Sequence, residues 1–337
     1  MMEKTLMIAG LLSSTLLATA QNSPYIKAVD EYVPAPGQFV NTMPALTEND
    51  TPETAAQKCT EAVAGKKQGE LITLGAYGGY ITFHFDHPLV NVEGDNDFKI
   101  YGNAFPGNSE PGIVMVSQDL NENGLPDDEW YELSGSADED SIGKVVYDYE
   151  ITYTKNSEPV TAVKWTDNKG NSGEIPRIEP WHPQEYYPLW ITEKQLTFKG
   201  TRLPNNSYKD PQTGWFKQNA FRYGYADNLD NENSFFNIEN AVDKDRKKVK
   251  LRSVNFVRVY CAMNQVVGNS VGETSTEFAG AEDLHPNATA VENISAEQTN
   301  RIIKSIYTID GREIKQLQRG VNIVRYSNGE TKKIIVK

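Results

Sequence analysis

The residues from Asp119 to Trp130 carry oxygen side chains at a spacing that suits a calcium ion. Calcium takes about six to eight oxygen ligands. A short loop can supply Asp or Asn at its first, third and fifth positions, Gly at the sixth and a backbone carbonyl at the seventh. This segment fits all five positions, and two carboxylates follow. The predicted ligands are Asp119, Asn121, Asn123, the carbonyl of Leu125, Asp127 and Asp128. The sequence therefore predicts one bound Ca²⁺.

The surroundings of this loop are not those of an EF-hand. Trp130 stands where an EF-hand has its bidentate glutamate. Residues 112–117 and 129–133 are rich in β-branched and aromatic side chains and lack a helical period, so we expect the loop to join two strands. The alternative is a polar turn without metal, because Asn and Asp are common in turns. Three alternating oxygen side chains favour calcium.

A second oxygen-rich stretch, residues 227–245, is spaced more loosely. We interpret it as a solvated connection between strands, since loops of this composition usually lie at the surface. Asp227, Asp230 or Asp243 could nevertheless complete a metal site.

The segment 181–190 brings four large aromatic rings together between prolines, which restrict the backbone. Rings on a stiff loop lose little entropy on binding and suit a flat or ring-shaped ligand, and the histidine could hydrogen-bond or ligate a metal centre. The predicted ligand-binding residues are Trp181, His182, Tyr186, Tyr187 and Trp190. The alternative is that the rings pack this loop onto the domain.

Catalysis is the competing class of function. A glycoside hydrolase needs two facing carboxyl groups, which Glu110, Asp128, Glu132 and Glu277 could supply. No stretch of sequence marks one of them as an acid in an apolar pocket. His84 and His87 could bind zinc, although we favour structural turn histidines. We therefore expect a noncatalytic protein.

Charge and the N-terminus indicate where the protein works. Lys and Arg number 33 against 46 Asp and Glu, a net charge of −13, so nucleic acid is not an expected partner. Residues 1–20 combine Lys4, an apolar run and small residues before Ala20, which is typical of a cleaved secretory signal peptide. The cleavage point lacks a cysteine, and the chain lacks an apolar stretch of about 20 residues. We expect a secreted or cell-surface protein that is neither a lipoprotein nor membrane-spanning.

The remaining sequence predicts the framework that holds these residues. One short helix begins near Thr51 and ends near Gly65, and the rest consists of short strands separated by Gly, Pro, Asn and Asp. This pattern predicts an all-β protein, a jelly-roll-like β-sandwich with one short N-terminal helix and a small C-terminal β module. The expected parts are a signal peptide (1–20), a calcium-binding β-sandwich domain (25–287), a linker (288–300) and the C-terminal module (301–337).

The C-terminal module carries YTIDGR at 307–312, GVNIV at 320–324 and KKIIV at 332–336. In this order the segments resemble the C-terminal sorting domain of type IX secretion in Bacteroidota. The resemblance covers roughly the last 45 residues. It implies an export route and says nothing of activity.

The body of the chain also resembles a family. The segments that carry the resemblance, besides the calcium-type loop, are FKIYGNAF at 98–105, EPGIV at 110–114, WYEL at 130–133, GETSTE at 272–277 and GAEDL at 280–284. They are similar to cell-surface proteins of Bacteroidota often encoded beside TonB-dependent uptake systems, including those for vitamin B12. The resemblance implies ligand capture at the surface, with a corrinoid (cobalamin-like) ligand and an outer-membrane TonB-dependent transporter as partner. A carbohydrate-binding module or a glycan-acting hydrolase is the alternative.

Overall fold

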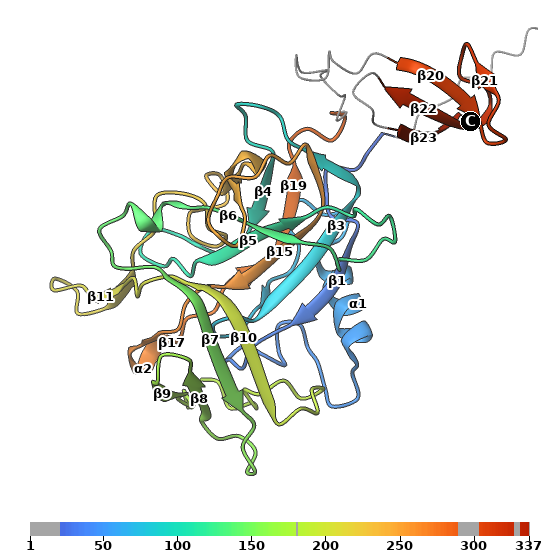
Figure 1. Ribbon diagram of the computed structural model, residues 1–337. Coiled ribbons are helices and arrows are strands. Elements are labelled where there is room, and N and C mark those ends of the chain that lie inside the picture. Colours follow the sequence, from blue (N-terminus) through green and yellow to red (C-terminus); the bar gives the residue numbers. More distant parts are fainter. Residues whose placement is uncertain (1–20, 180, 289–302, 327–330, 337) are drawn as a thin grey trace, which may run out of the picture. The chain divides into compact units, whose positions relative to one another are not determined.

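The computed structural model describes residues 21–179, 181–288, 303–326 and 331–336. The predicted signal peptide and nearly all of the predicted linker lie outside the described residues. The chain divides into two compact units, Met1–Ala288 and Thr289–Lys337. Strands dominate the described parts of both units (Figure 1). The expected all-β, sandwich-like fold class is thus confirmed.

The first unit is organised by a six-stranded sheet in which every neighbouring pair is antiparallel. Its order is β1 (Ala28–Val33), β3 (Tyr80–Val90), β15 (Ser253–Cys261), β5 (Gly112–Ser117), β6 (Trp130–Leu133) and β14 (Ala241–Val242). The strand β15 has partners on both sides, β3 and β5, and six of its nine residues are buried.

Smaller sheets complete the sandwich. They are β13 (Phe235–Phe236), β4 (Phe98–Tyr101) and β19 (Gly280–Asp283) in one sheet, and β18 (Glu277–Phe278) with β2 (Ile72–Thr73) in another. Aromatic side chains fill the interior: Phe83 of β3 packs against Phe278 at a centroid distance of 5.1 Å, and Phe98 stacks on Phe236 at 5.4 Å. Burial of such rings is the main favourable contribution to folding.

The predicted helix is α1 (Pro52–Val63). Thr51 caps it, because its hydroxyl accepts a hydrogen bond from the Thr54 N–H while the Thr54 side chain accepts one from the Thr51 N–H. The buried face, Ala55, Ala56, Cys59, Ala62 and Val63, joins the core. Cys59 and Cys261 are both free and buried. No helix among the described residues is long and apolar enough to cross a membrane.

A second core lies under the sheet β10 (Gln195–Arg202), β7 (Val146–Thr154), β8 (Val163–Asp167) and β9 (Ser172–Ile175). Figure 1 shows β7 and β10 side by side as long green and yellow-green arrows. Beside these sheets are two short hairpins, β11 (Ser207–Lys209) with β12 (Phe216–Gln218), and β16 (Val266–Val267) with β17 (Gly272–Glu273), the latter joined through α2 (Gly268–Val271).

The second unit is a four-stranded antiparallel sheet. Its order is β21 (Glu313–Ile314), β20 (Ile303–Thr308), β22 (Gly320–Tyr326) and β23 (Thr331–Val336). The turn between β20 and β21 contains Gly311 at φ +84°, a left-handed conformation that glycine adopts without steric cost. The expected C-terminal β module is therefore present.

Candidate functional site

The predicted calcium loop joins β5 to β6, the strand-to-strand setting expected from its flanks. The Asp119 carboxylate turns inward and accepts hydrogen bonds from the backbone N–H groups of Asn123 (3.0 Å) and Gly124 (2.9 Å). Gly124 has φ +73°, which explains why glycine occupies the sharp turn. Asp128 accepts from the Leu120 N–H at 2.9 Å. The loop thus curls around its own carboxylates.

Both asparagine side chains of the loop point to the same carboxylate. The amides of Asn121 and Asn123 donate to the two oxygens of Asp127 at 3.2 and 3.0 Å. Polar atoms of the predicted ligand side chains therefore gather on one side of the loop, a prerequisite for sharing one cation. Calcium itself, and each predicted ligand including the Leu125 carbonyl, stays a prediction.

The base of the loop is fixed to the sheet. The backbone N–H of Asp119 donates to Asn255 on β15 at 3.0 Å. At the other end, the Trp130 indole donates to the Pro126 carbonyl at 3.3 Å, and the Arg258 guanidinium lies 4.3 Å from the centroid of the indole. The loop and the central strand are therefore mechanically connected.

Three rings of the predicted aromatic segment are core residues. Tyr186 and Tyr187 are fully buried, and Trp190 stacks on Tyr32 at a centroid distance of 6.0 Å. The backbone holds them there, because the Tyr186 carbonyl accepts from the Gly37 N–H at 3.0 Å. The packing alternative therefore describes these three rings, which face protein instead of solvent.

The other two residues of that segment lie nearer the surface. Trp181 is 76 % exposed, and His182 packs edge-on against Phe39 at a centroid distance of 4.7 Å. Partial burial, with the charge of Arg177 as a second cause, lowers the pKa of His182. The prediction of ligand contact from this segment thus narrows to Trp181 and His182.

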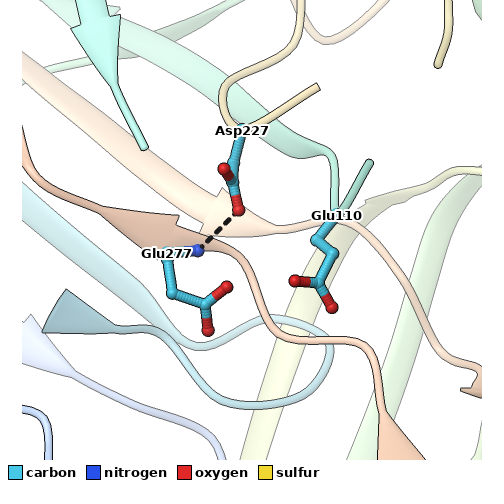
Figure 2. Close-up of side chains that lie close together, drawn as sticks. All are labelled: Glu110, Asp227 and Glu277. Carbon is cyan, nitrogen blue, oxygen red and sulfur yellow. Dashed lines mark hydrogen bonds between the residues drawn. The ribbon is translucent and has the colours of Figure 1, made fainter. Parts of the chain in front are cut away.

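The structure also assembles a group of acids, the carboxyl cluster, from Glu110, Asp227 and Glu277 (Figure 2). Glu110 precedes β5, Asp227 follows the loop after β12, and Glu277 begins β18. One carboxylate oxygen from each residue lies within 4.8 Å of those from the other two. Asp227 and Glu277 are buried, and Glu110 is half-buried. Hard cations prefer such oxygen groups, so the cluster is a second place where a metal could bind.

Asp227 is the most firmly held member of the cluster. Its Oδ1 accepts from the backbone N–H groups of Asn103 and Ala104, both at 2.8 Å, and its Oδ2 accepts from the Glu277 N–H at 2.9 Å (Figure 2). Its φ of +50° is a left-handed conformation that aspartate tolerates better than most residues. A Cβ at Gly102 would lie 2.4 Å from this Oδ1, so glycine is needed there.

Burial governs the charge of the cluster. It raises the pKa of Glu110 to about 8, helped by the negative charge of Asp227, and it raises the pKa of Glu277 far above its ordinary value. Burial also raises the pKa of Asp227 to about 7, although its three backbone hydrogen bonds oppose the shift. The three backbone donors favour the ionised form of Asp227, and burial favours the protonated form of the two glutamates unless a cation replaces their protons.

A fourth buried acid, Glu273, interacts electrostatically with the cluster. Burial raises its pKa to about 8, and Glu110 contributes to the shift. Its Oε1 accepts from the Gln38 N–H at 2.7 Å, whereas the buried Oε2 has no hydrogen-bond partner. Among the described residues, neither Glu273 nor any member of the carboxyl cluster forms an ion pair with Lys, Arg or His.

The carboxylates considered for hydrolysis end in different places. Glu110 and Glu277 meet in the carboxyl cluster, but Glu277 is buried and does not face an open cleft. Asp128 belongs to the calcium-type loop, and Glu132 pairs with Arg246 at 2.6 Å. The sequence analysis considered Glu110 and Glu277 as catalytic acids and Asp227 as a metal ligand. Nothing in the sequence indicated that the three side chains lie together.

The histidines considered for zinc bind carboxylates in the structure. His84 Nδ1 lies 2.8 Å from Asp30, and His87 bridges Asp86 and Asp283 at 2.6 Å each. These contacts give both side chains a structural role, because each one ties neighbouring segments together through a hydrogen-bonded ion pair when protonated.

Comparison with known proteins adds no assignment. No family model matches the chain, and no curated protein matches its sequence. Function is therefore argued from the motifs and from the geometry of the loop and the carboxyl cluster.

Proposed function

We propose that the protein is an exported, calcium-stabilised ligand-binding protein of the cell surface. The observation that carries the proposal is the loop of residues 119–128, in which five oxygen-bearing side chains at calcium-type spacing curl toward one another between two strands. Closing such a loop with a cation would offset the repulsion among its three carboxylates and fix the ends of β5 and β6.

The proposed ligand is a small molecule captured for uptake. The resemblance to surface proteins beside TonB-dependent systems favours a corrinoid delivered to an outer-membrane transporter, and a glycan is the alternative. Binding is preferred over hydrolysis because Glu110 and Glu277, the glutamates that meet, lie beside Asp227, and Glu277 is buried. A glycosidase instead needs its two carboxyl groups on either side of a bound sugar.

Calcium is tested with the purified mature chain. Elemental analysis should find one Ca²⁺ per molecule, and thermal unfolding should have a higher midpoint in excess Ca²⁺ than in excess EDTA. Asp119→Ala should abolish this shift. Glu48→Ala removes an equal charge from an exposed position elsewhere and should preserve it. Equal midpoints for the wild type in both buffers, with no metal found, would exclude a calcium site.

Ligand binding is tested by isothermal titration with cyanocobalamin and, separately, with a glycan panel. Binding of any of these compounds without turnover supports a capture protein. Release of shorter sugars during the titration would replace it with a hydrolase.

A further inference from the structure

The first unit contains a pocket of about 420 Å³ that none of the motifs singled out from the sequence predicted. The turn at residues 222–225, residues 233–237 and the end of β6 line it. Its volume falls in the range of about 300–1,000 Å³ that is usual for small-molecule sites. None of the residues that line it belongs to the calcium-type loop or to the carboxyl cluster.

Two aromatic rings line this pocket and remain partly open to solvent. Tyr223 is 41 % exposed and Phe235 is 38 % exposed, although Lys99 covers one face of Phe235 at 4.2 Å. Four asparagines also line the pocket, Asn96, Asn233, Asn237 and Asn240. The Asn237 amide already donates to the Asp95 carbonyl at 2.5 Å and accepts from the Glu239 N–H at 2.7 Å. Rings offer apolar faces, and amides offer both a donor and an acceptor. A ligand that is apolar on one face and rich in hydroxyl groups at its rim satisfies both.

Ser234 provides an independent sign of a missing partner. It lines the same pocket and is only 3 % exposed, and its hydroxyl makes no hydrogen bond with any described residue. A buried hydroxyl without a partner is unfavourable, since it has given up its hydrogen bonds with water. A hydroxyl group of a bound ligand could serve as the partner.

The charge of the pocket selects a neutral ligand. Arg222 is the one charged residue among those lining it, and its guanidinium already binds Asp140 at 2.5 Å and Glu139 at 2.7 Å. Lys99, which lies over Phe235, already donates to the carbonyls of Asn231 at 3.2 Å and Glu232 at 2.8 Å. An anionic ligand would therefore gain little from either cation and would meet the two carboxylates bound to Arg222.

We propose that this pocket binds a neutral carbohydrate, with a sugar ring stacked on Tyr223 or Phe235 and its hydroxyls bonded to the asparagine amides and Ser234. The inference deepens the proposed ligand-binding function and rests on it. The pocket suits a short sugar segment, whereas a complete corrinoid is too large for it to enclose.

The test uses the full mature chain and a panel of neutral oligosaccharides, including gluco-, manno- and xylo-oligosaccharides. Sialylated oligosaccharides and cyanocobalamin are added as comparison ligands. Wild-type protein should bind at least one neutral oligosaccharide, and Tyr223→Ala or Phe235→Ala should weaken that binding about tenfold or more. Trp215→Ala removes a ring that is 69 % exposed on the β11–β12 hairpin, outside the pocket, and should leave the affinity unchanged.

Ser234→Ala separates binding from folding. Removing the unpaired hydroxyl should weaken oligosaccharide binding about threefold to tenfold and leave the thermal midpoint unchanged or raised. A purely structural residue would lower the midpoint instead. This variant therefore keeps the inference testable even if a ring substitution reduces folding.

The outcomes distinguish the two proposals. If all three pocket variants bind oligosaccharide as well as the wild type, the pocket is not the binding site. The proposal of ligand capture would not be affected. Binding of cyanocobalamin or sialylated glycans alone also overturns the neutral-carbohydrate inference and leaves capture standing. A wild-type protein that binds none of these ligands overturns both.

Discussion

Two regions of this protein bring several carboxyl groups close together, and they differ in how the repulsion among these groups is reduced. The calcium-type loop, residues 119–128, is exposed, and its carboxylates accept hydrogen bonds from neighbouring backbone and asparagine N–H groups. The carboxyl cluster of Glu110, Asp227 and Glu277 is largely withdrawn from water, and burial raises the pKa of every member. Water and local donors surround the carboxylates of the loop, while the cluster must take up protons or a cation.

The contrast shows that the number of acids in a site does not determine its charge. An acid in the loop costs little without metal because solvent screens it. An acid in the cluster is tied to the fold, because ionising it changes the stability of the whole first unit.

The largest expected difference comes from removing the anchor of the cluster. Asp227→Ala would leave three backbone N–H groups without an acceptor. Each such buried donor costs about 1–3 kcal/mol, so the free energy of unfolding should fall by about 4 kcal/mol. Asp119→Ala, measured by urea denaturation in EDTA, should cost less than about 1 kcal/mol because water replaces the lost oxygens. Equal losses of unfolding free energy in the two variants would contradict the proposed difference between the cluster and the loop.

The next prediction concerns pH in the absence of metal. The folded pKa values of Glu110 and Glu273 are about 8 and that of Asp227 about 7, above the unfolded values near 4. The folded state therefore binds more protons than the unfolded state. The stability that these protons contribute is fully present below about pH 4 and is lost as pH rises toward 8. Between pH 5.5 and 8.5 in EDTA we expect the free energy of unfolding to fall by at least about 3 kcal/mol, which is the contribution of one such glutamate alone.

Glu277→Gln provides the control for this titration. It removes one ionisable group and keeps a similar shape, so the decline of stability with pH should become shallower. A wild-type protein whose stability is constant or increases over this interval would show that the cluster is already neutralised.

The third prediction assigns the effect of calcium to one region. Calcium at one hundred times its dissociation constant should raise the free energy of unfolding by about 2.7 kcal/mol. If the loop holds the ion, Asp119→Ala loses this gain and Glu277→Gln retains it. The opposite pattern in urea denaturation would place the ion in the carboxyl cluster.

The smallest expected effect concerns the glycine of the loop. Gly124 has φ +73°, and nothing lies within 4 Å of the Cβ that alanine would add, so Gly124→Ala should cost only about 1 kcal/mol in EDTA. Gly102→Ala would force a Cβ to 2.4 Å from Asp227 and should cost clearly more. Similar unfolding midpoints for the two variants would indicate that the cluster can rearrange freely.

Sequence reasoning reached the loop because its chemistry is contiguous. Alternating oxygen side chains, a glycine and flanking β-branched residues sufficed to predict a loop between two strands, which β5 and β6 confirm. The helix was visible for the same reason, since Thr51 and Pro52 are local signals for a helix start.

The carboxyl cluster could not be found in this way. Its members are separated by more than a hundred residues between Glu110 and Asp227 and by 50 between Asp227 and Glu277, and they meet only because nonlocal strand pairing places them together. The sequence also did not indicate which rings of the aromatic segment are buried. Trp181 and Tyr186 lie five residues apart in the same proline-rich stretch, yet one is exposed and the other is in the core.

The contact between Trp130 and Arg258 gives the protein an optical signal of its own. The indole is bonded to the Pro126 carbonyl inside the calcium-type loop and lies against a guanidinium on the central strand. Any tightening of the loop must alter the surroundings of this fluorophore. Emission from Trp130, isolated by replacing the other four tryptophans with phenylalanine, should then follow metal occupancy without a label.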